Sequence, residues 1–214
     1  MMNRPQLFDY FSKLATTACY IAPAIMVAAD ALTIALNRNF SPLKQTISRF
    51  AIGPYGWLEK LGMVMVAISF LFIAINLLRV KNQKDLRLLR FAGGLLVIVA
   101  IGFLMISIFN TNVIGTIISF HGLVHQIATA AVSVVFYLFC LILMRLMINK
   151  PGLRYFSLYS GLTFLIGLTV LVLLGFNYHQ NEYIGLLERM IAGFNLGWIV
   201  LIGPQVVKLA RSLQ

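Results

Sequence analysis

Six long apolar stretches, separated by short polar connections, dominate the pattern of residues along the chain. Each is long enough for a helix that crosses a hydrocarbon core of about 30 Å, which takes roughly 20 residues. The predicted spans lie at about 14–36, 57–78, 91–109, 118–147, 155–176 and 183–207. They occupy nearly the whole chain. The pattern therefore predicts one all-α transmembrane domain over residues 1–214, without a soluble domain or a separate catalytic module.

Composition supports the same class. Of the 214 residues, 60% are hydrophobic and 11% are charged, and the mean hydropathy is +0.91. These values lie well outside the balance of a soluble globular domain. We therefore expect a polytopic integral membrane protein in contact with membrane lipids.

The basic residues predict how the chain is oriented. They gather before the first span, between the second and third, between the fourth and fifth, and after the sixth. The positive-inside rule then places both termini in the cytoplasm and the protein in the inner (plasma) membrane. Because this distribution also accounts for the net charge of +11, no nucleic-acid partner is expected.

A six-residue pattern recurs at the start of each even-numbered span. The copies are GWLEKL from Gly56, GLVHQI from Gly122 and GLLERM from Gly185, which are 66 and 63 residues apart. That spacing equals one helical hairpin, so we expect a six-transmembrane-helix bundle made of three antiparallel hairpins. A true internal repeat and chance similarity both remain open.

The repeat also places ionisable side chains at one depth. Glu59, His125 and Glu188 are expected in one layer at the exterior mouth of the bundle, with Lys60, Gln126 and Arg189 beside them. An unpaired carboxylate below the membrane interface costs several kcal/mol. We therefore expect interhelical ion pairs, for example Glu188 with Lys60 or Glu59 with Arg189.

Asp30 is harder to explain structurally. It lies six residues before the end of the first span, roughly 9 Å into the membrane at about 1.5 Å per residue. A carboxyl group at that depth must be protonated, paired or facing water, so it is a candidate functional group. His125 is its expected partner if the first and fourth spans touch. The long exterior connection, residues 37–55, is the expected lid or recognition element.

His121 and His125 are four residues apart and share one helix face. With Glu59 or Glu188 they would supply two imidazoles and a carboxylate, as in a zinc site with an open position. The favoured alternative is that His125 hydrogen-bonds to a facing carboxylate within the bundle while His121 reaches the interface, so we predict no metal and no cofactor. Haem is not expected, because only His179, in a connection, is left as an opposing ligand.

Four segments together resemble a known family. They are ISRFAIGPYGWLEKLG, the turn FNTN, GLVHQIATA and GLLERMIAGFNLGW. The chain resembles the six-helix bacterial and archaeal membrane proteins of the domain of unknown function 998 family, which is distantly similar to damage-regulated autophagy modulator proteins. The resemblance implies the fold, the topology and a recurring His125, Glu188 and Arg189, but no biochemical activity. FNTN departs from the acidic FPTD-like turn of the family, so no acid there is given a role.

A shorter likeness suggests another function. HGLVH is similar to the HxxxH segment of the zinc-dependent ceramidase and progestin/adiponectin-receptor hydrolases, which have seven spans and draw a further His and an Asp from other helices. This chain has six predicted spans and no His in the second. The resulting alternative is a zinc-dependent intramembrane hydrolase, with His121, His125 and Glu188 as ligands and Asp30 as general base.

The favoured hypothesis is an outward-facing polar pocket that binds or transports a small molecule or a lipid headgroup, and not an enzyme. The candidate residues are Asp30, Glu59, Lys60, His121, His125, Glu188, Arg189 and Asn195, the last within the GFNLG segment that should pack closely. We expect cation or amine contact by the two glutamates, anion contact by Arg189 and Lys60, and proton exchange between Asp30 and His125. A third possibility is a subunit that only packs against a larger membrane complex.

Overall fold

The computed structural model describes residues 4–80, 86–113, 117–177 and 182–213. Over these residues the regular secondary structure consists of helices, with no strand. Its helices are α1 (Arg4–Leu36), α2 (Ile47–Phe50), α3 (Gly56–Leu78), α4 (Leu86–Ile108), α5 (Phe120–Met147), α6 (Arg154–Asn177), α7 (Ile184–Leu201) and α8 (Gly203–Ser212). Six helical stretches are long and apolar enough to cross a membrane. The predicted class, an all-α protein with six spans, is confirmed.

The spans agree with the sequence pattern to within a few residues. They are Phe8–Leu36, Gly56–Leu78, Arg87–Ile108, Phe120–Met147, Arg154–Leu174 and Ile184–Ser212. The first begins earlier and the last ends later than predicted, because these helices continue beyond the apolar stretch. The last span consists of α7 and α8, which meet at Ile202, directly before a helix start that contains Pro204. Proline suits the first turn of a helix, since it lacks a backbone N–H.

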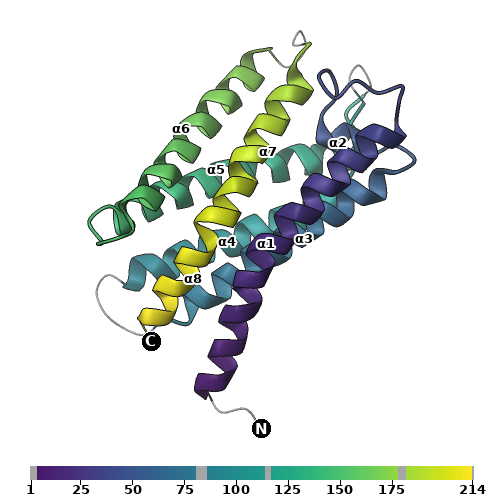
Figure 1. The fold of residues 1–214 in the computed structure, drawn as a ribbon. Coiled ribbons are helices and arrows are strands. Elements are labelled where there is room, and N and C mark those ends of the chain that lie inside the picture. Colours follow the sequence, from purple (N-terminus) through teal and green to yellow (C-terminus); the bar gives the residue numbers. More distant parts are fainter. Residues whose placement is uncertain (1–3, 81–85, 114–116, 178–181, 214) are drawn as a thin grey trace.

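The six long helices pack in chain order around a closed ring (Figure 1). α1 packs on α3, α3 on α4, α4 on α5, α5 on α6 and α6 on α7, while α7 and α8 return to α1. The antiparallel pairs α1/α3, α4/α5 and α6/α7 are the three predicted hairpins. Both described ends of the chain lie at one end of the bundle, called here the terminal end. Residues 37–55 lie at the opposite end, called the loop end.

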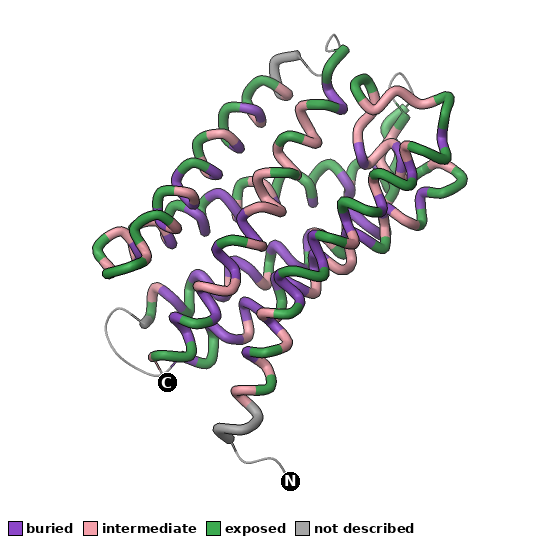
Figure 2. The backbone as a smooth tube through the Cα atoms, in the orientation of Figure 1, coloured by how far each residue is buried: buried purple, intermediate pink, exposed green. Residues whose placement is uncertain are grey.

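Burial follows the ring. Figure 2 shows buried residues mainly along the sides of the helices that face one another, and exposed residues on the outer sides. The outer sides carry large apolar side chains such as Val27, Ile101, Val134 and Leu165. Only 33–56% of the most apolar stretch of each span is buried within the protein. A surface this apolar is suited to lipid and not to water, so the chain is a multi-pass membrane protein.

The middle of the bundle is filled by aromatic rings. The Trp198 ring lies edge-on to those of Phe136 and Phe139, with centroid distances of 5.5 Å and 5.2 Å, and Phe136 also contacts Phe70 at 5.3 Å. The indole N–H of Trp198 donates to the hydroxyl of Ser160 at 2.9 Å. These residues form a packed layer at mid-depth, and the loop end lies above it.

Candidate functional site

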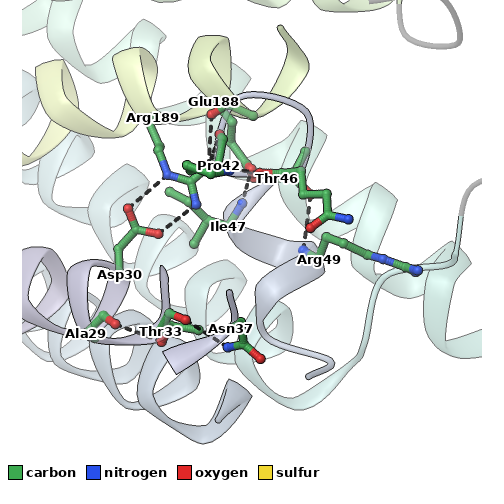
Figure 3. Close-up of polar contacts among 12 residues, drawn as sticks. Ala29, Asp30, Thr33, Asn37, Pro42, Thr46, Ile47, Arg49, Glu188 and Arg189 are labelled. Carbon is green, nitrogen blue, oxygen red and sulfur yellow. Dashed lines mark hydrogen bonds and ion pairs between the residues drawn. The ribbon is translucent and has the colours of Figure 1, made fainter. Parts of the chain in front are cut away.

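A bidentate ion pair joins the first and last spans near the loop end (Figure 3). Nε of Arg189 donates to Oδ2 of Asp30 at 3.0 Å, and Nη2 donates to Oδ1 at 2.8 Å. The side chains are 17% and 18% exposed, so each charge is compensated within the protein. The predicted pairing of Asp30 with His125 is therefore wrong, because α1 does not pack against α5.

Arg189 also holds the connection between α1 and α3. Its Nη1 donates to the backbone carbonyls of Pro42 at 2.7 Å, Gln45 at 2.8 Å and Gly185 at 3.2 Å. One guanidinium thus fixes α1, the connection and the first turns of α7. Only arginine has enough donors in a fixed planar arrangement for this, so lysine could not replace it.

Glu188 holds the same connection from the adjacent position. Its carboxylate accepts hydrogen bonds from the backbone N–H of Ile47 and from the hydroxyl of Ser48, the latter at 3.2 Å. The predicted Glu188–Lys60 ion pair is wrong, and Lys60 forms no ion pair with any described residue. Two neighbouring residues of α7 therefore bind two different stretches of residues 37–55.

The first turn of α7 lies directly against this connection. The backbone N–H groups of Gly185 and Leu186 donate to the carbonyl of Leu43 at 2.9 Å and 3.2 Å. A helix start leaves such donors unsatisfied, so the carbonyl of Leu43 serves as a cap. A Cβ atom at Gly185 would lie 2.3 Å from the carbonyl oxygen of Gln45 and 2.5 Å from that of Pro42. Only glycine allows this approach.

Glu59 is the acidic residue near the ion pair that lacks a hydrogen-bond partner among the described residues. It is fully buried in α3, and neither carboxyl oxygen has a hydrogen-bond partner among the described residues. Its charged neighbours are Asp30, Glu188 and Arg189. The predicted direct pair with Arg189 is wrong, because Asp30 occupies that guanidinium. Three carboxyl groups thus surround one guanidinium, and one of the three has unused acceptor capacity.

The repeated six-residue pattern has a structural meaning that differs from the predicted layer. Each of its glycines marks a close approach: a Cβ at Gly56 would lie 2.1 Å from the carbonyl oxygen of Ala51, and one at Gly122 would lie 2.0 Å from the side chain of Asn112. With Gly185, all three glycines make room for the connection that precedes or crosses their helix. The ionisable residues diverge, since Glu59 and Glu188 adjoin the ion pair whereas His125 does not.

His121 and His125 contact different parts of the protein. Nδ1 of His125, which is 5% exposed, donates to the backbone carbonyl of Phe109 at 2.7 Å, so its partner at this nitrogen is a carbonyl group and not the predicted carboxylate. His121 is exposed and lies against the rings of Phe109 and Phe120. His179 lies outside the described residues. Among the residues that are described, no three His, Cys, Asp or Glu side chains are grouped to hold a metal ion, and zinc stays a secondary hypothesis.

A cavity of about 140 Å³ lies inside the ring, between the aromatic layer and the connection. Its floor includes Phe70 and Phe136, and its upper boundary includes Ile47, Ser48 and Glu188. Most of the remaining wall is apolar and comes from α1, α3, α4, α5 and α7. The cavity therefore joins an apolar interior to the carboxylate that holds the connection in place.

Asn195 lines the same cavity. Its side-chain oxygen is buried and has no partner among the described residues. GFNLG is only partly the predicted packing face. A Cβ at Gly197 would lie 2.5 Å from the hydroxyl of Tyr159, but nothing lies within 4 Å of one at Gly193.

The sequence identified five side chains that meet here or adjoin the cavity, namely Asp30, Glu59, Glu188, Arg189 and Asn195, but not the partners of Glu188 and Arg189 in the connection. The partners are backbone groups of residues 42–47, together with Ser48. A backbone carbonyl carries no signal in the residue letters. The position of a polar connection before a Gly-Pro turn was the available clue, and it indicated the segment without its contacts.

A family model described as "Protein of unknown function (DUF998)" matches residues 20–204. No curated protein and no solved structure matches the chain.

Proposed function

The chain belongs to the DUF998 family, and from the geometry of the loop end we propose that it binds a small amphiphile inside the bundle and lets it pass at the loop end. The proposed ligand has a compact apolar group and a head that donates hydrogen bonds, such as an amine, a hydroxyl or a small lipid headgroup. The observation that carries this proposal is an apolar cavity bounded by the Glu188 carboxylate and by Asn195, whose side-chain oxygen has no partner among the described residues.

The size of the cavity supports a small apolar group. Its volume of about 140 Å³ is close to that of an engineered apolar cavity of about 150 Å³ that binds benzene. A cavity of this size accommodates one ring or a short branched alkyl group. A whole diacyl lipid would extend beyond it.

The polarity of the cavity supports a donating head. Asn195 lines the cavity and its buried side-chain oxygen has no partner among the described residues, while Glu188 lies at the upper boundary of the cavity. Glu59, also without a donor, is a charged neighbour of Glu188. A buried acceptor without a partner costs about 1–3 kcal/mol, and a ligand that supplies the donor recovers that energy.

Glu188 supports a link between binding and opening. It lines the cavity and also accepts hydrogen bonds from Ile47 and Ser48 of the connection. A cationic or hydroxyl head that approaches this carboxylate competes with those two donors. Residues 37–55 would then act as a lid that loosens when the cavity is filled, which suits transport or sensing.

A side entrance is supported by the packing of α5. Thr129 lines the cavity and is nevertheless exposed, and the ring contacts of Phe136 and Phe139 of α5 with Trp198 of α7 lie in the aromatic layer below it. An amphiphile would enter from the lipid between these helices and leave at the loop end. From the positive-inside rule we place the loop end on the exterior side of the inner membrane.

Benzylamine is a suitable probe, with toluene and benzoate as comparators that lack the donor or carry the opposite charge. We expect benzylamine to raise the unfolding temperature of the detergent-solubilised protein more than toluene or benzoate does. Asn195→Leu removes the acceptor and fills part of the cavity, so this gain should be lost. Asn39→Leu, at an exposed position of the connection, is the matched control.

Equal shifts with all three compounds would contradict a donor-selective cavity. An unchanged benzylamine response in Asn195→Leu would contradict the location. No response to any probe would favour a protein that only packs against a larger complex.

A further inference from the structure

A second cavity lies outside the ring, on the loop-end surface. It has a volume of about 280 Å³ and lies between residues 44–49 and residues 111–113, which follow α4. Its polar lining consists of Lys44, Gln45, Thr46, Arg49, Thr111 and Asn112. Among the residues that the structure describes, no Asp or Glu lines it. The cavity is therefore rich in donors, in contrast to the acceptor-rich cavity inside the ring.

Arg49 contributes a hydrogen-bond donor that no described residue of the protein uses. Its Nη1 atom is buried and has no hydrogen-bond partner among the described residues. The backbone at this position is fixed, because its N–H donates to the hydroxyl of Thr46 at 3.1 Å. Figure 3 shows the Arg49 side chain extending away from the Asp30–Arg189 ion pair. A shielded guanidinium with an unused N–H is costly unless an acceptor binds it.

Asn112 contributes a second donor whose direction is set. Its Oδ1 accepts hydrogen bonds from the backbone N–H of Ser119 at 3.0 Å and from the hydroxyl of Ser119 at 2.8 Å. The carbonyl end of the amide is therefore occupied, and the free end is the NH₂ group, which is buried without a partner. The side chain lies against Gly122, where any Cβ atom would overlap it, so it cannot easily turn.

Two further side chains limit which ligands would fit this cavity. Lys44 brings a positive charge to the rim and is paired only through an exposed contact with Glu182 at 3.1 Å. Gln45 has a buried side-chain oxygen without a partner, which requires a donor from the ligand. A halide has no donor. A phosphate that carries a hydroxyl, either its own or that of an attached glycerol, satisfies both kinds of group.

We propose that this surface cavity is a binding site for a hydroxyl-bearing phosphate, with Arg49 and Asn112 as its principal donors. The phosphate is either free in solution or the headgroup of an anionic lipid such as phosphatidylglycerol. Arginine provides the paired donors that fit phosphate oxygens. The site does not depend on the cavity inside the ring, so it stands if the proposed amphiphile binding fails.

The test uses the full chain in a neutral detergent, titrated calorimetrically with inorganic phosphate, and in nanodiscs of phosphatidylglycerol or phosphatidylcholine. Lipid retention is read by native mass spectrometry. Arg49→Gln should weaken binding at least about tenfold, as expected for loss of a hydrogen bond to a charged group. Arg38→Gln removes an exposed arginine of the same connection and should leave binding unchanged.

Asn112→Asp provides a second variant in case Arg49→Gln misfolds. It keeps the oxygen that Ser119 needs, replaces the free NH₂ with an oxygen and should abolish binding without a loss of thermal stability. A phosphate response without selective lipid retention identifies a soluble ligand, and retention of phosphatidylglycerol without a phosphate response identifies the lipid.

The proposal is overturned if neither form binds, if both variants bind as the wild type does, or if Arg38→Gln loses as much affinity as Arg49→Gln.

Discussion

The terminal half of the bundle and the loop half differ in how many of their buried polar groups have hydrogen-bond partners within the protein. The terminal half contains paired groups: the hydroxyl of Ser12 donates to Asn76 at 2.8 Å, and that of Ser157 to the carbonyl of Met144 at 2.7 Å, while Ser69 and Tyr137 are its unpartnered exceptions among the described residues. Unpartnered buried side-chain atoms occur on seven described residues, and five of these line a cavity or adjoin the Asp30–Arg189 pair: Gln45, Arg49, Glu59, Asn112 and Asn195.

This difference suggests that one half of the bundle supports the fold and the other half binds ligands. A paired and tightly packed half holds the helices in register. A half with unmet donors and acceptors retains binding capacity, and such groups in a folded protein call for a ligand, an ion or water. The sites proposed above both lie in the loop half, one rich in acceptors and the other in donors.

A substitution in the aromatic layer should have the largest effect and tests whether this layer supports the bundle. Trp198→Ala should lower the free energy of unfolding by about 3 to 5 kcal/mol, because it leaves a cavity among Phe136, Phe139 and Ser160. Cys19 and Cys140 are buried and unpaired, so a thiol-reactive dye reports unfolding in detergent. Trp57→Ala, at a position that is 61% exposed, is the control and should change little. Similar losses in both variants would mean that the layer does not support the bundle.

Breaking the Asp30–Arg189 ion pair should cause the next largest loss of stability. Arg189→Met leaves Asp30 without its partner and releases the carbonyls of Pro42 and Gln45. Removing one member of a buried pair costs about 3 to 5 kcal/mol, and the partial exposure here reduces the expected loss to about 2 to 4 kcal/mol. Trypsin should also cleave faster after Lys44. Asp30→Asn added to Arg189→Met should recover part of the stability.

The terminal end offers a matched control for that variant. Arg211 pairs with Asp9 at 2.7 Å, but these side chains are 54% and 48% exposed. Arg211→Met should therefore cost less than about 1 kcal/mol and leave cleavage at Lys44 unchanged. A loss equal to that of Arg189→Met would remove the distinction between the two ends.

The smallest of these effects concerns two glycines of α7. Gly185→Ala should destabilise by about 1 to 3 kcal/mol and loosen the connection, because the added methyl group overlaps the carbonyls of Gln45 and Pro42. Gly193→Ala has open space around it and should be neutral, or stabilising by up to about 1 kcal/mol through helix propensity. Proteolysis and thermal unfolding distinguish the two, and the reverse order would contradict the docking of residues 42–45 on α7.

The fold was largely predictable because lipid-facing helices must be apolar along their whole length. The six spans, the three hairpins and the family followed from that pattern and from a few segments such as GLVHQIATA. The site was only partly predictable. The depth of Asp30 indicated that the carboxyl group needs a partner, a proton or water, but the partner could not be identified from the sequence, because helix rotation decides which side chains meet.

The structural role of the repeated six-residue pattern also could not be predicted from the sequence. Its charged residues suggested a functional layer, whereas its glycines proved to be the common structural element. Arg49 and Asn112 carried no sequence signal, since an exterior arginine and a turn asparagine are ordinary. Their interest comes from burial without a partner, which only the folded arrangement reveals.

The docking of residues 42–48 on α7 has a consequence for how the protein is made. Ile47 and its partner Glu188 are 141 residues apart, so at about 5 to 20 residues per second the first connection waits roughly 7 to 28 s after synthesis for its binding partner. During that interval its carbonyls and Asp30 have no guanidinium to hold them. Insertion of the last hairpin is therefore the event that completes the loop end, and a ribosome that stalls before Arg189 leaves the earlier spans with their acidic residue uncompensated.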